Sequence, residues 1–268
     1  MLLPTSSAES DARRIAASGS LVLLPSGGGA AVRVVERLGA GGHAEVWRAV
    51  DDLGRSVALK TLRPELRNEK AAAAALLREY DVLTQVPHPR IVRTLGLSVL
   101  DDLPAVLLEY APNGDLVPLL GAHPRHWLAA AAQVLSALAH LHARGFVHRD
   151  VKPRNVLFAA DDTVRLVDFA SALPIGSRLP RGGSTAEYVA PGGDRVGPEA
   201  DCYAFAVLLF ELVYGGLPSA DGTPTGAPLA PLGEAAERLG SAASAALAAA
   251  HREPWGLLDF ANVIESAV

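Results

Sequence analysis

A glycine-rich segment, LGAGGHAEVW from Leu38 to Trp47, could bring backbone N–H groups close to an anionic ligand. Gly39 and Gly41 stand two residues apart between two expected strands. The missing Cβ atoms would let N–H groups there approach a triphosphate. Most glycine-rich hairpins are only turns, so this segment does not identify a site on its own.

A lysine and a glutamate further along the chain are both expected to be buried. Strand alternation puts Lys60 on the same face as the apolar Ala58 and Leu62, although a lone lysine there could also extend to water. In the helix that follows, Glu79 falls on the same stripe as Leu76, and a buried carboxylate requires a cation. The sequence therefore predicts an ion pair between Lys60 and Glu79.

The amino-acid composition bears on the cellular location of the protein and on its binding partners. The chain has 268 residues, a net charge of -5 and one cysteine, Cys202, which excludes an internal disulfide and is expected to be a buried thiol. The longest apolar runs, Trp127–Leu141 and Tyr203–Tyr214, fall short of the roughly 18 residues that span a bilayer, so we expect buried helices. No secretion signal is apparent. These features predict a cytoplasmic protein with no affinity for nucleic acid or membranes.

The elements that must position these residues change character along the chain. Residues 1–31 are rich in Ser, Ala and Gly and are expected to be an N-terminal extension, with a possible strand at Leu21–Leu24. Residues 32–111 are expected to form a small β-rich lobe with one major helix, and residues 112–268 a mainly helical lobe. The expected strands are Val32–Leu38, Ala44–Val50, Ser56–Leu62, Thr94–Val99 and Ala105–Glu109, and the expected helices are about Glu69–Gln85, Pro124–Arg144, Pro198–Tyr214, Gly233–His251 and Leu257–Val268.

Two motifs in the second half carry a specific resemblance. The run HRDVKPRN from His148 to Asn155 is followed by Asp168-Phe169-Ala170, and the earlier segments His88–Val92 and Leu108–Ala111 come in a matching order. From about Val32 to Asn262 the chain resembles Hanks-type serine/threonine protein kinases, which implies a bilobal α+β fold. Considered alone, Asp150 could cap a turn and Asn155 could hydrogen-bond to loop carbonyls.

The resemblance implies a role for each site residue in phosphoryl transfer from ATP. Asp150 would orient the acceptor hydroxyl and take its proton, and Lys152 would lie beside the γ-phosphate. Asn155 and Asp168 would offer oxygens to Mg²⁺. Lys60, fixed by Glu79, would hold the α- and β-phosphates beside Gly39 and Gly41. The positions matching the adenine site are Leu38, Val46, Ala58 and Leu157 around the ring and Glu109 and Ala111 at the hinge.

Four departures from the family pattern are apparent. Ala44 replaces a glycine, which is tolerated if its φ is negative, and Ala170 replaces a glycine that could adopt positive φ. Gly192 stands where the family usually has a glutamate, and the expected arginine partner is missing near residues 253–257. The helical lobe is also short after the helix that carries Asp201. A dedicated partner protein could therefore help to select the substrate.

Three functions remain open at this point. The leading hypothesis is a kinase for protein serine or threonine hydroxyls, because Lys152-Pro153 is typical of that class. The alternatives are a nucleotide-binding interaction module resembling pseudokinases, suggested by Ala170 and Gly192, and a small-molecule kinase of the same fold. Regulation could act through Arg149, which often pairs with a phosphorylated segment in such kinases. The candidate acceptors are Ser171, Ser177, Ser184 and Thr185, of which Thr185 is expected to have a structural role first.

Overall fold

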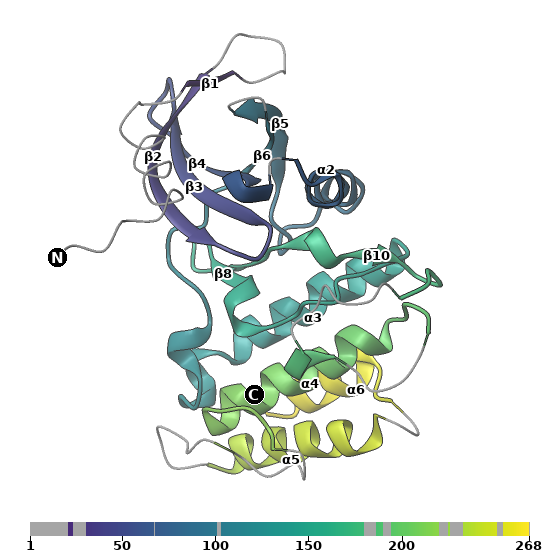
Figure 1. Ribbon diagram of the computed structural model, residues 1–268. Helices are drawn as coiled ribbons and strands as arrows, with labels where there is room; N and C mark the ends of the chain where they lie inside the picture. The colour runs from purple at the N-terminus through teal and green to yellow at the C-terminus, as the bar shows by residue number, and fades with distance from the viewer. Residues whose placement is uncertain are drawn as a thin grey trace, which may run out of the picture. The chain divides into compact units, whose positions relative to one another are not determined.

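The computed structural model in Figure 1 describes residues 21–23, 31–66, 68–100, 103–179, 186–189, 194–219, 225, 233–250 and 254–267. The chain divides into two compact units, Met1–Gln85 with Val92–Tyr110 and Val86–Ile91 with Ala111–Val268. Ala111 and the short stretch Val86–Ile91 thus group with the second unit, whereas the sequence placed them in the first lobe.

The first unit is built on an antiparallel six-stranded sheet in the order β1-β2-β3-β4-β6-β5. The strand expected near Leu21 is present as β1, which pairs with β2 and also contacts β5, so this part of the N-terminal extension belongs to the sheet. A turn at Asp52–Arg55 joins β3 to β4, with the Gly54 N–H donating to the Asp51 carbonyl at 2.9 Å. The strand bounds are β1 Leu21–Leu23, β2 Ala31–Ala40, β3 Ala44–Asp51, β4 Ser56–Leu62, β5 Thr94–Leu100 and β6 Leu103–Glu109.

Strand alternation gives this sheet two different faces. On one face, a buried apolar cluster includes Trp47, Leu59 and Leu107. On the other, Lys60 is paired in register with Val46 on one side and with Val106 on the other. Because directly opposed residues share a face, the nonpolar strands surround the lysine ammonium with apolar neighbours.

Among the described residues of the first unit, the major helix is α2, Lys70–Gln85. It contacts β4, β5 and β6 (Figure 1). Its buried residues, Ala72, Leu76, Glu79, Val82 and Leu83, form the expected stripe at helical spacing. A glutamate is therefore fixed inside the apolar face of the helix, as the sequence predicted.

The second unit is mainly helical. Its helices are α3 Leu128–Ala143, α4 Glu199–Tyr214, α5 Glu234–Ala249 and α6 Leu257–Glu265, and two short hairpins pair β7 Phe146–Val147 with β10 Leu173–Pro174 and β8 Val156–Phe158 with β9 Val164–Leu166. Helix α4 is buried along nearly its whole length, which confirms that its apolar run is a core helix. It packs closely on α5, where a Cβ on Gly240 would lie 2.4 Å from the Tyr214 hydroxyl.

Two helix boundaries differ from expectation. The helix expected from Pro124 begins as a 3₁₀ turn at Pro124–His126, and the α-helix starts only at Leu128 because Trp127 leaves the helical conformation with φ of -131°. The last helix ends at Glu265. Between α4 and α5, the described residues, 215–219, 225 and 233, contain no helix. None of the helices in the described part of the chain is long and apolar enough to cross a membrane.

Candidate active site

The Lys60–Glu79 ion pair lies wholly within the first unit. Lys60 Nζ is 2.6 Å from Glu79 Oε2, and the two side chains are 9% and 0% exposed. The sheet supplies the lysine from β4 and the helix supplies the glutamate from α2. The ion pair is therefore confirmed. It holds a lysine ammonium at a fixed place on the apolar face of the sheet.

The glycine-rich hairpin is the second feature of the first unit. The Gly41 N–H donates to the Ala44 carbonyl at 2.8 Å, and Ala44 begins β3, an extended strand with negative φ. Ala44 therefore has the negative φ that lets an alanine replace the glycine usual in the family. A Cβ added to Gly39 would meet no atom within 4 Å, and one on Gly41 would meet only the Ala44 carbonyl at 3.9 Å. Packing within the protein does not require glycine at either position, which leaves room there for a ligand.

The remaining nucleotide candidates of the first unit lie on β2, β3, β4 and β6. Val46 is half-buried, Ala58 is buried, and Leu38 is 43% exposed. Val46 and Ala58 both point to the lysine face of the sheet, because Val46 pairs with Lys60 and Ala58 precedes Lys60 by two residues. Glu109 ends β6, with its N–H bonded to the Arg93 carbonyl at 2.8 Å. Their contacts with adenine remain predictions.

In the second unit, the catalytic-loop candidates meet at one carboxylate. Asp150 Oδ2 accepts hydrogen bonds from Lys152 Nζ at 2.8 Å and from Asn155 Nδ2 at 2.9 Å. Asn155 Nδ2 also donates to the Asp150 carbonyl at 2.7 Å. All three residues belong to one short stretch, in which Pro153–Asn155 form a 3₁₀ turn. The turn brings the lysine and the asparagine back over the aspartate.

The loop itself is fixed by Asp201 at the start of α4. This carboxylate is fully buried and accepts the backbone N–H of His148 at 2.8 Å and that of Arg149 at 2.7 Å. Asp201 thus anchors the loop through two of its backbone N–H groups. The loop needs this support because Arg149 has a positive φ of 69°, which a non-glycine residue adopts at a cost.

His148 has a structural position. It is fully buried, its Nδ1 accepts the Asp150 N–H at 3.3 Å, and its Nε2 lies 3.0 Å from the Val167 carbonyl. This arrangement fits a neutral ring with the proton on Nε2. Burial lowers the pKa of His148, more than the neighbouring carboxylates raise it. His148 therefore joins the catalytic loop to the residue before Asp168 and does not act as a base.

Asp168 follows directly after this junction. The Val167 N–H donates to the Asn155 carbonyl at 2.9 Å, so the two predicted metal ligands stand on connected segments. Asp168 has φ of 65° and ψ of 68°, a left-handed conformation that is costly outside glycine and is often found at functional sites. Ala170 lies inside the 3₁₀ turn Phe169–Ser171, where φ is negative, so glycine is not needed there.

The donor set fits a magnesium ion bound together with phosphate. Both side-chain hydrogen bonds of Asn155 use Nδ2, which leaves Oδ1 as an acceptor, and Asp168 supplies a carboxylate. No group of three or more His, Cys, Asp or Glu side chains within the described ranges could hold a metal alone. Mg²⁺ commonly takes one or two protein oxygens and completes its shell with phosphate and water.

Two further candidates lie in the second unit. Leu157 is half-buried on β8 and forms an isolated bridge with Asp115. Ala111 is half-buried, and its N–H makes no hydrogen bond within the described part of the chain. Both positions remain compatible with contact to an adenine ring. Neither contact is tested by the structure.

Two contacts were not anticipated from the sequence. The Tyr188 hydroxyl donates a short hydrogen bond to Glu211 Oε2, a buried carboxylate in the middle of α4. His142 Nε2 lies 2.8 Å from Asp201 Oδ2. A carboxylate inside the apolar run Tyr203–Tyr214 could have signalled the first contact, since it requires a partner. The predictions for Ser184, Thr185 and Gly192 lie outside the described residues.

The comparisons agree with this architecture. The family model for the protein kinase domain matches residues 32–228, nearly three quarters of the chain. With a lysine–glutamate pair in the sheet unit and an HRD-type loop anchored by a helix in the other unit, the chain belongs to the protein kinase domain family.

Several of its relatives are bacterial kinases. The chain is 31% identical over 198 residues to serine/threonine-protein kinase PrkC of Bacillus subtilis, an alignment that covers 69% of the chain and 31% of that protein. It is 34% identical over 194 residues to a probable serine/threonine-protein kinase of Streptomyces coelicolor, covering 66% of the chain and 29% of that protein. The chain thus spans about a third of the length of these relatives.

Proposed function

We propose that this chain transfers the γ-phosphate of ATP to a serine or threonine hydroxyl of a protein substrate. The observation that carries the proposal is the carboxylate of Asp150, which Lys152 and Asn155 hold from two sides on a loop fixed by Asp201. Its two hydrogen-bonded neighbours fix where a proton would be accepted.

The chain's own residues divide the work of the reaction. Asp150 orients the substrate hydroxyl and accepts its proton as the hydroxyl oxygen bonds to the γ-phosphorus and the bond to the ADP oxygen breaks. Lys152, next to that carboxylate, stabilises charge on the transferring group. Mg²⁺, when bound through Asn155 and Asp168, neutralises phosphate charge. Lys60, oriented by Glu79, binds the α- and β-phosphates.

Further features support the proposed substrate class and the proposed cytoplasmic location. The dipeptide Lys152-Pro153 and the names of the bacterial relatives favour serine or threonine over tyrosine. The single cysteine, Cys202, is buried, and burial raises the pKa of its thiol to about 12, so it stays protonated and suits a reducing cytoplasm. A dedicated partner protein would assist in substrate selection. Ala170, one of the sequence features that suggested a nucleotide-binding interaction module, is accommodated without strain in its 3₁₀ turn.

The test is phosphate transfer by purified protein and its Asp150→Asn variant. Autophosphorylation and labelling of a generic protein substrate with Mg-ATP are quantified, and phosphosites are mapped by mass spectrometry. Loss of a positioned proton acceptor should lower turnover about 10²- to 10⁴-fold. Glu237→Gln, an exposed change on α5, serves as the matched control and should retain full activity.

Thermal melting separates chemistry from folding in this experiment. Asn at position 150 can still accept from Lys152, so the melting temperature should change little. Equal labelling by wild type and Asp150→Asn would refute the kinase assignment. Labelling of small metabolites but of no protein hydroxyl would overturn the substrate class.

A further inference from the structure

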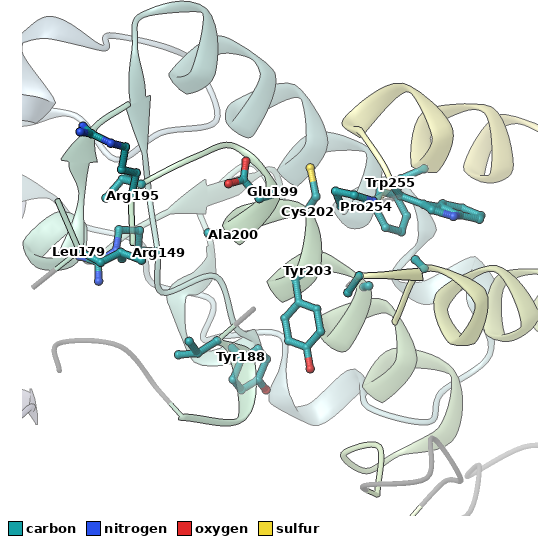
Figure 2. Close-up of a pocket in the computed structure, with 16 residues that line it drawn as sticks. Arg149, Leu179, Tyr188, Arg195, Glu199, Ala200, Cys202, Tyr203, Pro254 and Trp255 are labelled. Atoms are coloured by element: carbon teal, nitrogen blue, oxygen red, sulfur yellow. The ribbon is translucent and has the colours of Figure 1, made fainter. Parts of the chain in front are cut away.

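A cavity of about 170 Å³ lies within the second unit, apart from the Asp150 cluster (Figure 2). Its walls come from α4, the end of α5, Pro254-Trp255 with the start of α6, and parts of the segment from Leu179 to Val196. An engineered cavity of about 150 Å³ takes a benzene molecule, so this one has room for a single aromatic ring.

Small side chains make the cavity possible. Four alanines line it, Ala200 and Ala206 on α4 and Ala246 and Ala250 at the end of α5. Larger residues at these positions would fill the space, as side chains do in most protein interiors. Pro254 and Trp255, which also line it, stand in the region where the sequence lacks the family's arginine. The cavity therefore borders a region in which the sequence lacks the arginine that is usual in the family.

The two ends of the cavity differ in chemistry. At one end, Trp255 packs on Phe260 with ring centroids 5.2 Å apart, and Tyr203 also lines the cavity. At the other end lie Arg149 and Arg195, which Figure 2 shows on the side away from Trp255. A ligand that fits both ends has a flat apolar body and a polar head.

The charges at the polar end favour an anion. Arg149 Nη1 donates to the Ser171 carbonyl at 3.1 Å and Arg195 Nη1 to the Gly176 carbonyl at 2.8 Å, and neither guanidinium forms an ion pair with any residue that the structure describes. Glu199 is the single carboxylate of the lining. It folds back over Gly197, where an added Cβ would lie 2.1 Å from its Oε1.

The other titratable groups of the lining stay neutral. Burial raises the pKa of Cys202 to about 12, and burial also raises the pKa of Tyr188 and of Tyr203. With two guanidinium groups and one carboxylate, the lining carries a net positive charge. Two arginines that form no ion pair with the described residues are suited to a carboxylate or phosphate ligand.

We propose that this cavity binds a small aromatic anion, with its ring between Trp255 and the alanines and its negative group at Arg149 and Arg195. The ligand would touch Tyr188 and Arg149 at once, and Arg149 directly precedes Asp150. It would thus hold the segment around Tyr188 against the helices without entering the phosphoryl-transfer site. The proposal does not depend on catalytic activity.

The test uses 4-fluorophenylacetate as the probe and fluorine NMR as the readout, in the presence of saturating Mg-ATP to block nucleotide sites. Wild type and Asp150→Asn should both broaden the probe signal saturably at millimolar concentrations. The uncharged 4-fluorophenylacetamide should bind at least about tenfold more weakly. Equal binding of acid and amide, or no saturable binding of the acid, would overturn the proposal.

Paired variants localise the binding. Ala246→Leu fills the cavity and should weaken binding about tenfold or more, whereas Ala245→Leu, one residue away on the exposed face, should not. Ala200→Leu, at a half-buried position, repeats the test if Ala246→Leu melts early. Unchanged affinity in a folded cavity-filling variant would contradict the proposed location.

The charge requirement is tested at an exposed arginine. Arg195→Gln should weaken binding of the acid about threefold to tenfold and leave binding of the amide unchanged. Arg178→Gln is the matched control, because Arg178 is exposed, forms a backbone bridge with Arg195 and does not line the cavity. An equal effect of both changes would show that general charge, and not this cavity, attracts the probe.

Discussion

Among the described residues, each unit contains a fully buried carboxylate that fixes candidate site residues of its own unit, and the two carboxylates are held in different ways. Glu79 of the first unit meets a side chain, Lys60 Nζ, at 2.6 Å. Asp201 of the second unit meets two backbone N–H groups, those of His148 and Arg149, and the ring of His142. The first carboxylate fixes another side chain, and the second fixes the course of the chain.

This difference indicates which of the two carboxylates could be replaced without a large loss of stability. A buried ion pair can be removed as a whole and exchanged for apolar groups with little loss of stability, while removal of one partner leaves a buried charge. Backbone N–H groups cannot be removed, so the loss of Asp201 leaves donors that no second substitution can eliminate. We therefore expect that a second substitution can restore stability after the loss of Glu79 in the first unit. We expect no such recovery after the loss of Asp201 in the second unit.

The largest effect is expected for Asp201→Leu. The free energy of unfolding should fall by about 3–5 kcal/mol, because His142 and two backbone donors lose their acceptor together. Adding His142→Leu should restore little, since each buried N–H left without a partner still costs about 1–3 kcal/mol. Chemical denaturation measures both, with Glu237→Leu on the exposed face of α5 as control. Full recovery of the unfolding free energy in the double variant would contradict the expected difference between Asp201 and Glu79.

The single variant Glu79→Leu should also lose about 3–5 kcal/mol, because Lys60 is left buried without its counterion. The double variant Lys60→Met with Glu79→Leu should return to within about 1 kcal/mol of wild type in the same denaturation experiment. Phosphate transfer should stay low in both, since Lys60, which is proposed to bind the phosphates, is lost or misdirected. A double variant no more stable than the single one would remove the contrast between the units.

A smaller effect is expected at Tyr188→Phe, which deprives Glu211 of its hydrogen-bond donor. The cost should be about 1–3 kcal/mol of unfolding free energy. Burial raises the pKa of Glu211, and the Tyr188 hydrogen bond lowers it, so the variant should have a still higher pKa. A raised folded pKa gives stability that is complete below the unfolded value, about 4.3, and is lost as pH rises through the folded pKa.

The Tyr188→Phe variant should therefore be destabilised more at about pH 7 than at about pH 4, relative to wild type. Denaturation at both pH values measures the difference. In a Glu211→Gln background, which has no carboxyl to titrate, the same tyrosine change should show no such pH dependence. A penalty that is independent of pH in the presence of Glu211 would contradict the assigned hydrogen bond.

The smallest effect is expected for Ala170→Gly, which restores the residue usual in the family. Because Ala170 lies in a 3₁₀ turn with negative φ, glycine should only add freedom to the unfolded chain and cost about 0.5–1 kcal/mol. Turnover should stay close to wild type. A large gain in turnover would show that alanine restrains the Asp168 segment after all.

Much of the fold could be predicted because its patterns are local. Strand alternation in β4 placed Lys60 on the apolar face, and the helical repeat in α2 placed Glu79 on a stripe with leucines. The pairing of the two residues therefore followed from the strand period and the helix period separately. The second-unit core helices were also recognisable from their apolar runs. The site residues came from motif order, and the structure supports the positions of Asp150, Lys152 and Asn155 relative to one another.

Contacts between distant segments were harder to foresee. Nothing in Leu21–Leu23 indicates that this strand would join the sheet and contact β5, because pairing of a short strand depends on which edge is free. The hydroxyl of Tyr188 and the carboxylate of Glu211 are 23 residues apart, and either could have met another partner. The cavity beside Trp255 is lined by alanines of two helices that are distant in sequence, so it depends on how those helices pack.

The sequence by itself determined which residue types are available and on which face of a strand or helix each one lies, because those depend on spacing along the chain. Only the tertiary structure decided what each buried charge meets. Glu79 and Asp201 look alike in sequence, as acidic residues in apolar helices, yet one binds an ammonium and the other holds two backbone N–H groups. That choice depends on packing between segments, which spacing along the chain does not encode.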